Sequence, residues 1–584
     1  MISKQEQISL YKEELEEINL ETKQIFDSPA FSLFQSGQLF VGQYKGYDQN
    51  RGNIFIDLNS GSGFNLPRID QSLCCFKFLD QNYKPKQWVN QSYTDLLENL
   101  NSEKDTSEVK LVDFMNSDRE GFVRLIINQV DIDFVESLVY NQILGLGPTI
   151  PPFDYIVNLI KFSNAIESNN EIWNKVLNFE YKFDINRIPE LVNENIDIAQ
   201  FIIDETDKYG FFILQGPPGT GKTYQMADVI SRLALKNKSV LLTALTNKSI
   251  IEVCEKQFLF ELMNLGKVSK TRISTSEKTK FPKLNSIKEI IPIKGEICLA
   301  TYYQFSKCWE SILNGFDYVI VEEASQAFLT TIAAAFKVGK KVIVVGDPYQ
   351  IEPILKYKNF ATISPYIDKL KNGLQTICGL SEIPFYRKIE TRRLTPRATK
   401  FTNYFYQNTI ISKSLYQNLK DDIKKLNFLG SYVNELGGPT LILSNINDKE
   451  DISSISPFLI KAINEIKVQK SGTIAILTPF IKTAILLQKE LKIKTKSKDY
   501  LIETIDRVQG LDVDFCFLII PNISYNFSLN MNRFNVATSR AKKATFIIMN
   551  KKFNNKVFLK GNSGIYLNNL FSDSQNVKIL NNDL

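Results

Sequence analysis

The sequence predicts an α/β protein built on two successive parallel-sheet domains, preceded by a helical region and a small β-barrel. Its 584 residues are too many for one hydrophobic core and correspond, at roughly 150 residues per domain, to about four structural units. Hydrophobic residues make up 43% and charged residues 23%, as is typical of globular proteins. From residue 195 onward, short β-branched runs alternate with helical stretches, which is the pattern of sheets covered on both faces.

The first third of the chain divides into three predicted parts. Residues 1–36 carry apolar side chains at helical spacing among Glu and Lys, which predicts a stalk-like amphipathic helix. Residues 37–84 hold three short apolar or alternating runs split by Gly and Asn turns, which predicts a small β-barrel or meander. Residues 85–194 are predicted to be mostly helical, with a turn or crossing segment at 145–152.

Two α/β domains follow, over residues 195–384 and 385–584. Each contains five predicted strands separated by helical stretches. The strands of the first domain are expected at 211–214, 240–245, 297–300, 318–321 and 342–345. Those of the second are expected at 440–443, 473–477, 501–505, 515–520 and 545–549.

The composition excludes much of the common catalytic chemistry. The chain has no His, and its seven Cys are scattered without a Cys-x-x-Cys pair. These features argue against catalytic triads, Cys/His zinc sites and iron–sulfur clusters. Unpatterned cysteines are typical of reduced thiols, so a cytoplasmic location is expected. The start is not signal-like and no 18-residue apolar stretch is present, so no membrane association is expected.

The strongest motif lies between the strand at 211–214 and a predicted helix that runs to residue 230. Residues 216–223 read G-P-P-G-T-G-K-T, in which backbone N–H groups and the helix N-terminus can hold phosphates. Lys222 would reach the β and γ phosphates and Thr223 would offer its hydroxyl to Mg²⁺. The predicted nucleotide-binding residues are Gly216, Pro217, Pro218, Gly219, Thr220, Gly221, Lys222 and Thr223.

Acidic and amide side chains follow two later strands of the same domain. The strand at 317–321 ends in Glu322, placed to bind the metal, and Glu323, placed to orient or deprotonate water. A solvated strand end is the alternative for two adjacent acids, but the P-loop favours the functional interpretation. Gln350 follows the strand at 341–346 and can sense the γ phosphate or position water.

These segments belong to an ordered series along residues 195–550 that resembles the superfamily 1 helicases. The similar branch, subfamily B, contains the up-frameshift helicase, senataxin and the immunoglobulin-mu-binding helicase. The matching segments are 195–200, 216–223, 243–248, 300–301, 322–326, 346–350, 390–396, 477–480, 504–510 and 533–541. The resemblance implies two tandem RecA-like motor domains, ATP and Mg²⁺ as cofactors, and 5′→3′ movement on single-stranded RNA or DNA.

Further site residues are implied by this resemblance. Arg393 and Arg540 would reach the γ phosphate from the second domain, because guanidinium groups neutralise the charge that develops there when the domains close. They complete a catalytic set with Lys222, Glu323 and Gln350. Gln200 would read adenine, and Arg392 stands where many relatives have a stacking Tyr. Also implied are Gly510 at the nucleotide and, at the nucleic-acid strand, Thr246, Asn247, Thr301, Thr478 and Thr504.

The chain departs from the family pattern at the metal site, where Glu322 replaces the usual Asp and is one methylene longer. This change and Arg392 support an alternative function, a nucleotide-switched nucleic-acid clamp or remodelling subunit of a defence or repair complex that does not unwind duplexes. A P-loop kinase for small molecules is disfavoured because it would explain neither Arg540 nor the second α/β domain.

The net charge of +6 is too small to indicate a nucleic-acid partner, but the basic residues are unevenly distributed along the chain. Residues 267–294 contain eight basic residues and only two acidic ones, Glu277 and Glu289. They lie in a predicted insertion at about 262–296 that either faces the nucleic-acid strand or forms a solvated surface.

Overall fold

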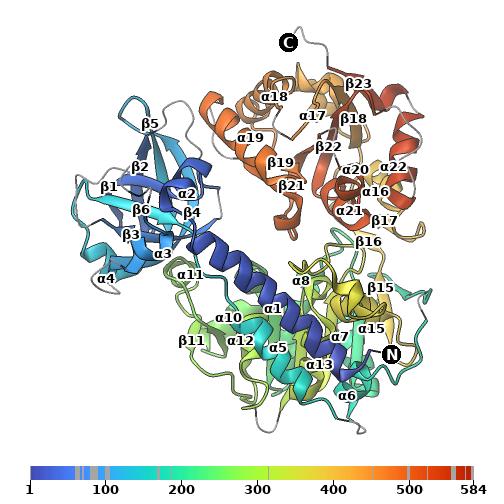
Figure 1. The fold of residues 1–584 in the computed structure, drawn as a ribbon. Helices are drawn as coiled ribbons and strands as arrows, with labels where there is room; N and C mark the ends of the chain where they lie inside the picture. The colour runs from blue at the N-terminus through green and yellow to red at the C-terminus, as the bar shows by residue number, and fades with distance from the viewer. Residues whose placement is uncertain are drawn as a thin grey trace.

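The computed structural model shows an N-terminal barrel joined by a long helix to two α/β domains (Figure 1). Its described residues are 2–580 except 60–65, 69–70, 79–87, 89, 99–104, 168–170, 185, 313–314, 450, 496–499, 522–523, 554–560 and 573. Among them, no helix combines the length and apolar character needed to span a bilayer.

A closed six-stranded antiparallel barrel occupies most of residues 40–147. In spatial order its strands are β1 (Phe40–Asp48), β2 (Asn53–Asn59), β5 (Phe122–Asn128), β4 (Thr106–Asn116), β3 (Ser72–Lys77) and β6 (Ile143–Gly147). The short helices α2 (Ala30–Ser36), α3 (Tyr93–Glu98) and α4 (Ile132–Glu136) accompany it. Because the barrel is closed, each of these strands is paired on both sides.

The predicted boundary between a barrel at 37–84 and a mostly helical region at 85–194 is therefore wrong. Strands β4, β5 and β6 all come after residue 84. In β5, Val123, Leu125 and Ile127 alternate with more exposed positions, which is the period of a half-buried strand. The segment predicted as a turn at 145–152 begins inside β6. A side chain at Gly145 would overlap the Phe76 ring, so this glycine lets an aromatic side chain lie against the strand.

Helix α1 (Lys4–Phe26) connects the barrel to the first α/β domain. Ser3 and Glu6 form a capping box at its N-terminus, which satisfies otherwise unpaired N–H groups. The helix packs along α5 (Asp154–Asn164), and the Tyr11 hydroxyl donates a 2.8 Å hydrogen bond to Thr330 Oγ1 of the first domain. The helix predicted at the N-terminus is present and links two parts of the molecule.

The first α/β domain has a nine-stranded parallel sheet. In spatial order the strands are β11 (Asn285–Ile287), β10 (Val268–Thr271), β12 (Ile297–Thr301), β9 (Val240–Ala244), β13 (Phe316–Val321), β14 (Gly339–Gly346), β8 (Phe211–Gln215), β15 (Phe385–Lys388) and β7 (Glu190–Val192). The domain extends beyond the predicted 195–384 at both ends, because β7 and β15 pair within this sheet.

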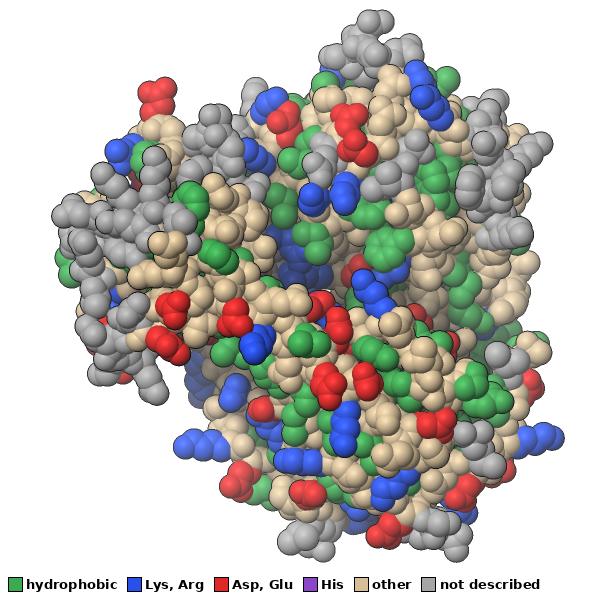
Figure 2. All heavy atoms as spheres, viewed as in Figure 1, with side chains coloured by type: hydrophobic (Ala, Val, Ile, Leu, Met, Phe, Trp, Pro, Cys, Tyr) green, Lys and Arg blue, Asp and Glu red, His purple; other side chains and the backbone are tan. Residues whose placement is uncertain are grey.

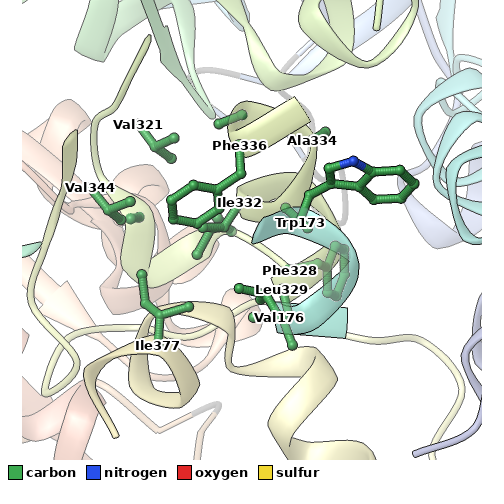
Figure 3. Packing of buried hydrophobic residues seen from close by; sticks show 14 of the residues in the cluster. Trp173, Val176, Val321, Phe328, Leu329, Ile332, Ala334, Phe336, Val344 and Ile377 are labelled. Atoms are coloured by element: carbon green, nitrogen blue, oxygen red, sulfur yellow. The ribbon is translucent and has the colours of Figure 1, made fainter. Parts of the chain in front are cut away.

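Both faces of this sheet are covered, as the β-branched runs predict. Alternate residues of β13 enter opposite hydrophobic clusters, Val319 and Val321 on one face and Ile320 on the other. Figure 3 shows part of the first cluster, which contains Phe336 of α13 (Leu329–Val338). Trp173 of α6 (Ile172–Leu177) joins the same cluster, so the segment after the barrel helps to build this core.

The segment predicted as a basic insertion at 262–296 contributes two strands, β10 and β11, to the edge of the sheet. Several of its basic side chains are engaged inside the domain. Lys270 is buried and contacts Glu277, while Lys280 pairs with Glu255. Lys294 lies 2.5 Å from Asp317. The segment is thus part of the α/β fold, and these lysines connect elements within it.

The second α/β domain has a six-stranded parallel sheet. Its strands, in spatial order, are β20 (Leu501–Thr504), β19 (Ile474–Thr478), β21 (Val513–Ile520), β22 (Ala541–Asn550), β18 (Gly438–Ser444) and β23 (Val577–Ile579). Its longer helices are α18 (Ser456–Val468), α19 (Ile481–Lys494), α21 (Met531–Thr538) and α22 (Gly561–Phe571). The five predicted strands are confirmed, and β23 is an addition that the sequence pattern did not indicate.

Candidate active site

The P-loop lies between β8 and α8 (Lys222–Leu235), at the seam between the two α/β domains. Gly219 and Gly221 have φ angles of +75° and +73°, which residues with side chains rarely adopt. A Cβ at Gly216 would overlap the Lys222 side chain, whose Nζ donates a 2.7 Å hydrogen bond to Gly216 O. The loop is therefore shaped so that backbone groups and the lysine surround one space.

Glu322 and Glu323 occupy different environments at the end of β13. Glu322 is fully buried, and its Oε1 accepts a 3.0 Å hydrogen bond from Thr223 Oγ1. Burial, reinforced by the neighbouring Glu323, raises the pKa of Glu322 to about 8, although Lys222 acts in the opposite direction. Glu323 has a φ of +54°, a strained backbone conformation of the kind found at functional sites.

The pair Thr223 and Glu322 suits a bound Mg²⁺ ion. Glu322 Oε2 is buried and has no hydrogen-bond partner among the described residues, so one carboxylate oxygen is left for another ligand. Burying such an oxygen without compensation is costly, and a hard divalent cation beside a carboxylate and a hydroxyl would remove that cost. Glu322, although longer than the usual Asp, still lies beside Thr223.

Arg393, on the segment between the two sheets, and Arg540, of the second α/β domain, reach the same seam. A cavity of about 230 Å³ is lined by both arginines together with Lys222, Glu323 and Gln350. Arg393 Nη1 donates a 3.0 Å hydrogen bond to Ser539 O. Arg540 is 1% exposed, and burial, together with the nearby Arg393, lowers its pKa to about 9. The structure thus brings the five predicted catalytic residues together.

A buried polar network connects the predicted phosphate sensor to the second α/β domain. Gln350 Nε2 donates to Asp347 Oδ2 at 3.2 Å, and the Tyr406 hydroxyl donates to the same carboxylate. Asn535 of α21 donates hydrogen bonds of 2.7 Å to the Tyr406 hydroxyl and 2.8 Å to Tyr349 O. This network links Gln350 to α21 through an unbroken series of buried hydrogen bonds.

Gln509 is a site residue that the sequence did not single out. Its Nε2 donates hydrogen bonds of 2.6 Å to Glu323 Oε2 and 2.9 Å to Ser325 Oγ, while its Oε1 accepts one of 2.6 Å from Gln326. It precedes Gly510, which lines the seam cavity. The signal available in the sequence was its place within the 504–510 motif.

Replacing Gln509 by Ala should lower strand-stimulated ATP turnover by about 10- to 100-fold, the scale of a lost hydrogen bond to a charged group. The reason is that Glu323 would lose its contact with the second α/β domain. Steady-state phosphate release measures the effect, with the exposed Gln469→Ala in the same domain as control. Equal turnover of both variants and the wild type would show that the contact has no catalytic role.

The two residues predicted to contact the adenine base, Arg392 and Gln200, lie in different surroundings. Arg392 lines the seam cavity and pairs with Glu194 at 2.6 Å. Gln200 is not among the described residues that line it; its amide donates to Asp204 Oδ1 at 2.6 Å and accepts from Lys236 at 3.2 Å. The structure therefore brings Arg392 to the site and leaves Gln200 engaged elsewhere.

The threonines predicted to hold a strand lie at the carboxyl ends of paired strands. Thr301 ends β12 and pairs with Ala244 of β9, and Thr246 follows two residues later as the cap of α9 (Asn247–Cys254). In the second α/β domain, Thr478 of β19 pairs with Thr504 of β20. Each α/β domain thus holds its own group of predicted contacts: Thr246 and Asn247, the first residue of α9, are exposed, whereas Thr301, Thr478 and Thr504 are buried.

A cavity of about 470 Å³ adjoins these strand ends. Its walls include Ile18 and Thr22 of α1, Leu245 and Tyr303 of the first α/β domain, and Asp506 of the second. The cavity therefore lies where α1 and both α/β domains meet, beside the predicted contacts.

The fold and the seam define a two-domain P-loop ATPase. Family models described as AAA domain match residues 201–373 and 392–552 and together cover more than half of the chain. The chain belongs to the superfamily 1 helicases, in the branch of the up-frameshift helicase, which confirms the resemblance seen in the motifs.

Two curated relatives and one solved structure illustrate the similarity. "DNA replication ATP-dependent helicase/nuclease dna2" of Schizosaccharomyces pombe is 26% identical over 57% of this chain and 26% of that protein. "Regulator of nonsense transcripts 1 homolog" of Neurospora crassa is 24% identical over 64% of this chain and 38% of that protein. The chain thus matches well under half the length of either relative. A crystal structure of Arterivirus nonstructural protein 10 (helicase) aligns over 83% of this chain and 78% of its own at 12% identity, with a TM-score of 0.36.

Proposed function

We propose that this chain is an ATP-driven, Mg²⁺-dependent helicase that moves 5′→3′ on single-stranded nucleic acid. The observation that carries the proposal is the seam cavity, where Lys222 and Glu323 of the first α/β domain share a lining with Arg540 of the second. Nucleotide hydrolysis at such a seam can change the angle between two domains. The Schizosaccharomyces pombe relative named as a DNA replication ATP-dependent helicase/nuclease supports the same activity.

The chain's own residues would carry the reaction as follows. Lys222 and the P-loop N–H groups hold the phosphates, and Glu323 orients the attacking water and accepts its proton. Arg393 and Arg540 neutralise the charge that develops on the transferring phosphoryl group. Thr223 and Glu322 would hold Mg²⁺, which supplies further neutralisation of the phosphate oxygens when bound.

Movement along a strand would follow from the two groups of contacts, one on each α/β domain. Thr246 and Thr301 belong to the first domain, and Thr478 and Thr504 to the second, so a change in domain angle alters the distance between the groups. The network from Gln350 to Asn535 connects the nucleotide to that angle. Alternating binding and release of the strand by the two groups during the ATP cycle produces steps.

ATPase assays with matched RNA and DNA oligonucleotides test this function and identify the preferred strand. We expect stimulation by at least one of them, and displacement of a duplex that carries a 5′ overhang but not of one with a 3′ overhang. A nucleotide-switched clamp would bind the strand and leave both duplexes intact. Absence of stimulation by either strand would refute the proposed motor.

We also propose a cytoplasmic location and partners in a defence or repair system. All seven cysteines are free thiols and five of them are buried, as suits a reducing compartment. Affinity capture from cells, with the wild type and with a variant that binds ATP but does not hydrolyse it, tests for such partners.

A further inference from the structure

Among the described residues, two ion pairs connect the barrel region to the second α/β domain, and we call them the clasp. Lys492 in the last turn of α19 lies 3.5 Å from Asp113 of β4, and its side chain is 3% exposed. Arg68, between β2 and β3, lies 3.8 Å from Glu503 of β20, and these two side chains are 7% and 3% exposed. Three of the four side chains are therefore deeply buried, and separating the pairs is costly because each buried charge would lose an oppositely charged neighbour.

One half of the clasp touches a predicted strand contact. Glu503 Oε1 accepts hydrogen bonds from Thr504 N at 2.7 Å and from Thr504 Oγ1 at 3.1 Å. Arg68 therefore pairs with the same carboxylate that fixes the Thr504 hydroxyl. The barrel region is connected in this way to the strand contacts of the second α/β domain.

The clasp completes a closed circuit of contacts beside the 470 Å³ cavity. The barrel region joins α1 through the Phe26 and Tyr93 rings, whose centroids lie 5.1 Å apart, and α1 joins the first α/β domain through Tyr11. The first α/β domain contacts the second through Glu323 and Gln509. Figure 1 shows these four parts arranged around a centre, and Figure 2 shows a hollow between the barrel, α1 and the second α/β domain.

We propose that the single strand passes through the space between the barrel, α1 and the two α/β domains and that the clasp closes this space into a ring, so that the substrates of this protein are linear single strands with a free end. A circular or end-blocked strand enters only when Lys492 separates from Asp113 and Arg68 from Glu503. This inference rests on the proposed function, because it names the substrate class of the same strand-binding surface.

The experiment compares a linear oligonucleotide that has one free end with the same oligonucleotide blocked at both ends by a bulky protein. Association rates come from stopped-flow anisotropy for the wild type, for Lys492→Glu and for the reversed pair Asp113→Lys with Lys492→Glu. We expect the wild type to bind the blocked strand about tenfold more slowly, because the ring must open first. Because Lys492→Glu removes one of the two pairs, it should narrow the difference between the two rates, and the reversed pair should restore the wild-type difference.

The matched control is Lys494→Glu on the same helix, where Lys494 is 55% exposed and pairs with Glu490. It should behave as the wild type. If Lys492→Glu fails to fold, Asp113→Asn weakens the same pair from its more exposed partner, which is 33% exposed.

If the wild type binds the free-ended and the blocked strand at equal rates, the proposed ring is refuted. It is also refuted if the difference between the two rates is unchanged in every folded variant of the clasp. Strand-stimulated ATPase with the free-ended oligonucleotide is measured in parallel. If that stimulation is present, only the ring is refuted; if it is absent and the free-ended strand does not bind, the proposed function itself fails.

Discussion

Arg540→Ala should lower strand-stimulated ATP turnover by about 10³-fold or more, the scale found for arginines that complete a phosphoryl-transfer site. Arg540 lines the seam cavity with Lys222 and Glu323, so its guanidinium group is placed to meet the charge that develops during phosphoryl transfer. Turnover is measured by phosphate release at saturating ATP and strand. Nucleotide affinity should change far less than turnover, because the group acts on the transition state.

Two controls separate this catalytic loss from a structural one. Arg540 Nε also donates to Val536 O at 2.8 Å, so thermal unfolding of the variant is recorded alongside the kinetics. Arg540→Lys keeps the charge without the guanidinium fork and should recover only a small part of the rate. Arg119→Ala, at an exposed arginine of the barrel, should leave turnover unchanged. Wild-type turnover in a folded Arg540→Ala protein would contradict the two-sided seam.

Glu323→Gln should reduce ATP turnover by about 10²- to 10⁴-fold while leaving ATP binding intact, as expected for loss of a general base. The amide keeps the size of the side chain but cannot accept the proton of the attacking water. A fluorescent ATP analogue measures binding, and phosphate release measures turnover. The variant should therefore hold ATP for much longer than the wild type.

The matched control for this variant is Glu435→Gln, at a side chain that is 63% exposed on the second α/β domain. It should match the wild type in both assays. If turnover persists in Glu323→Gln, a group other than Glu323 must orient and deprotonate the attacking water. Loss of ATP binding together with turnover would instead give Glu323 a role in holding the nucleotide.

The two α/β domains could be predicted because their strands are continuous β-branched runs, and each expected strand is present. The barrel was only partly predicted. Strand β4 shifts register between Leu111 and Asp113, which interrupts the alternation that marks a strand in the sequence. The four-residue strand β15 was assigned to the wrong domain, since so short a run does not indicate which sheet it joins.

The catalytic residues could be predicted because they lie in motifs of recognisable order and spacing. Contacts between the two domains could not be predicted from the sequence. Gln509 and Glu323 are 186 positions apart in the sequence, and only the packing of the two domains brings their side chains within 2.6 Å. Gln200 differs, because its amide is engaged within the first α/β domain, by Asp204 one turn along the same helix and by Lys236.

The two arginines at the seam, Arg393 and Arg540, are attached to different parts of the molecule. Shortly after β15, Thr391 Oγ1 donates to Pro218 O at 2.8 Å and Arg392 N donates to Gly219 O at 3.0 Å, so the crossover is fastened to the phosphate loop itself. Arg393 is the next residue along, whereas Arg540 lies between α21 and β22 of the second sheet. When the two halves of the molecule part, we expect the backbone at Arg393 to stay with the phosphate loop while its side chain leaves Ser539 O and Asp512, and Arg540 to move with the second sheet.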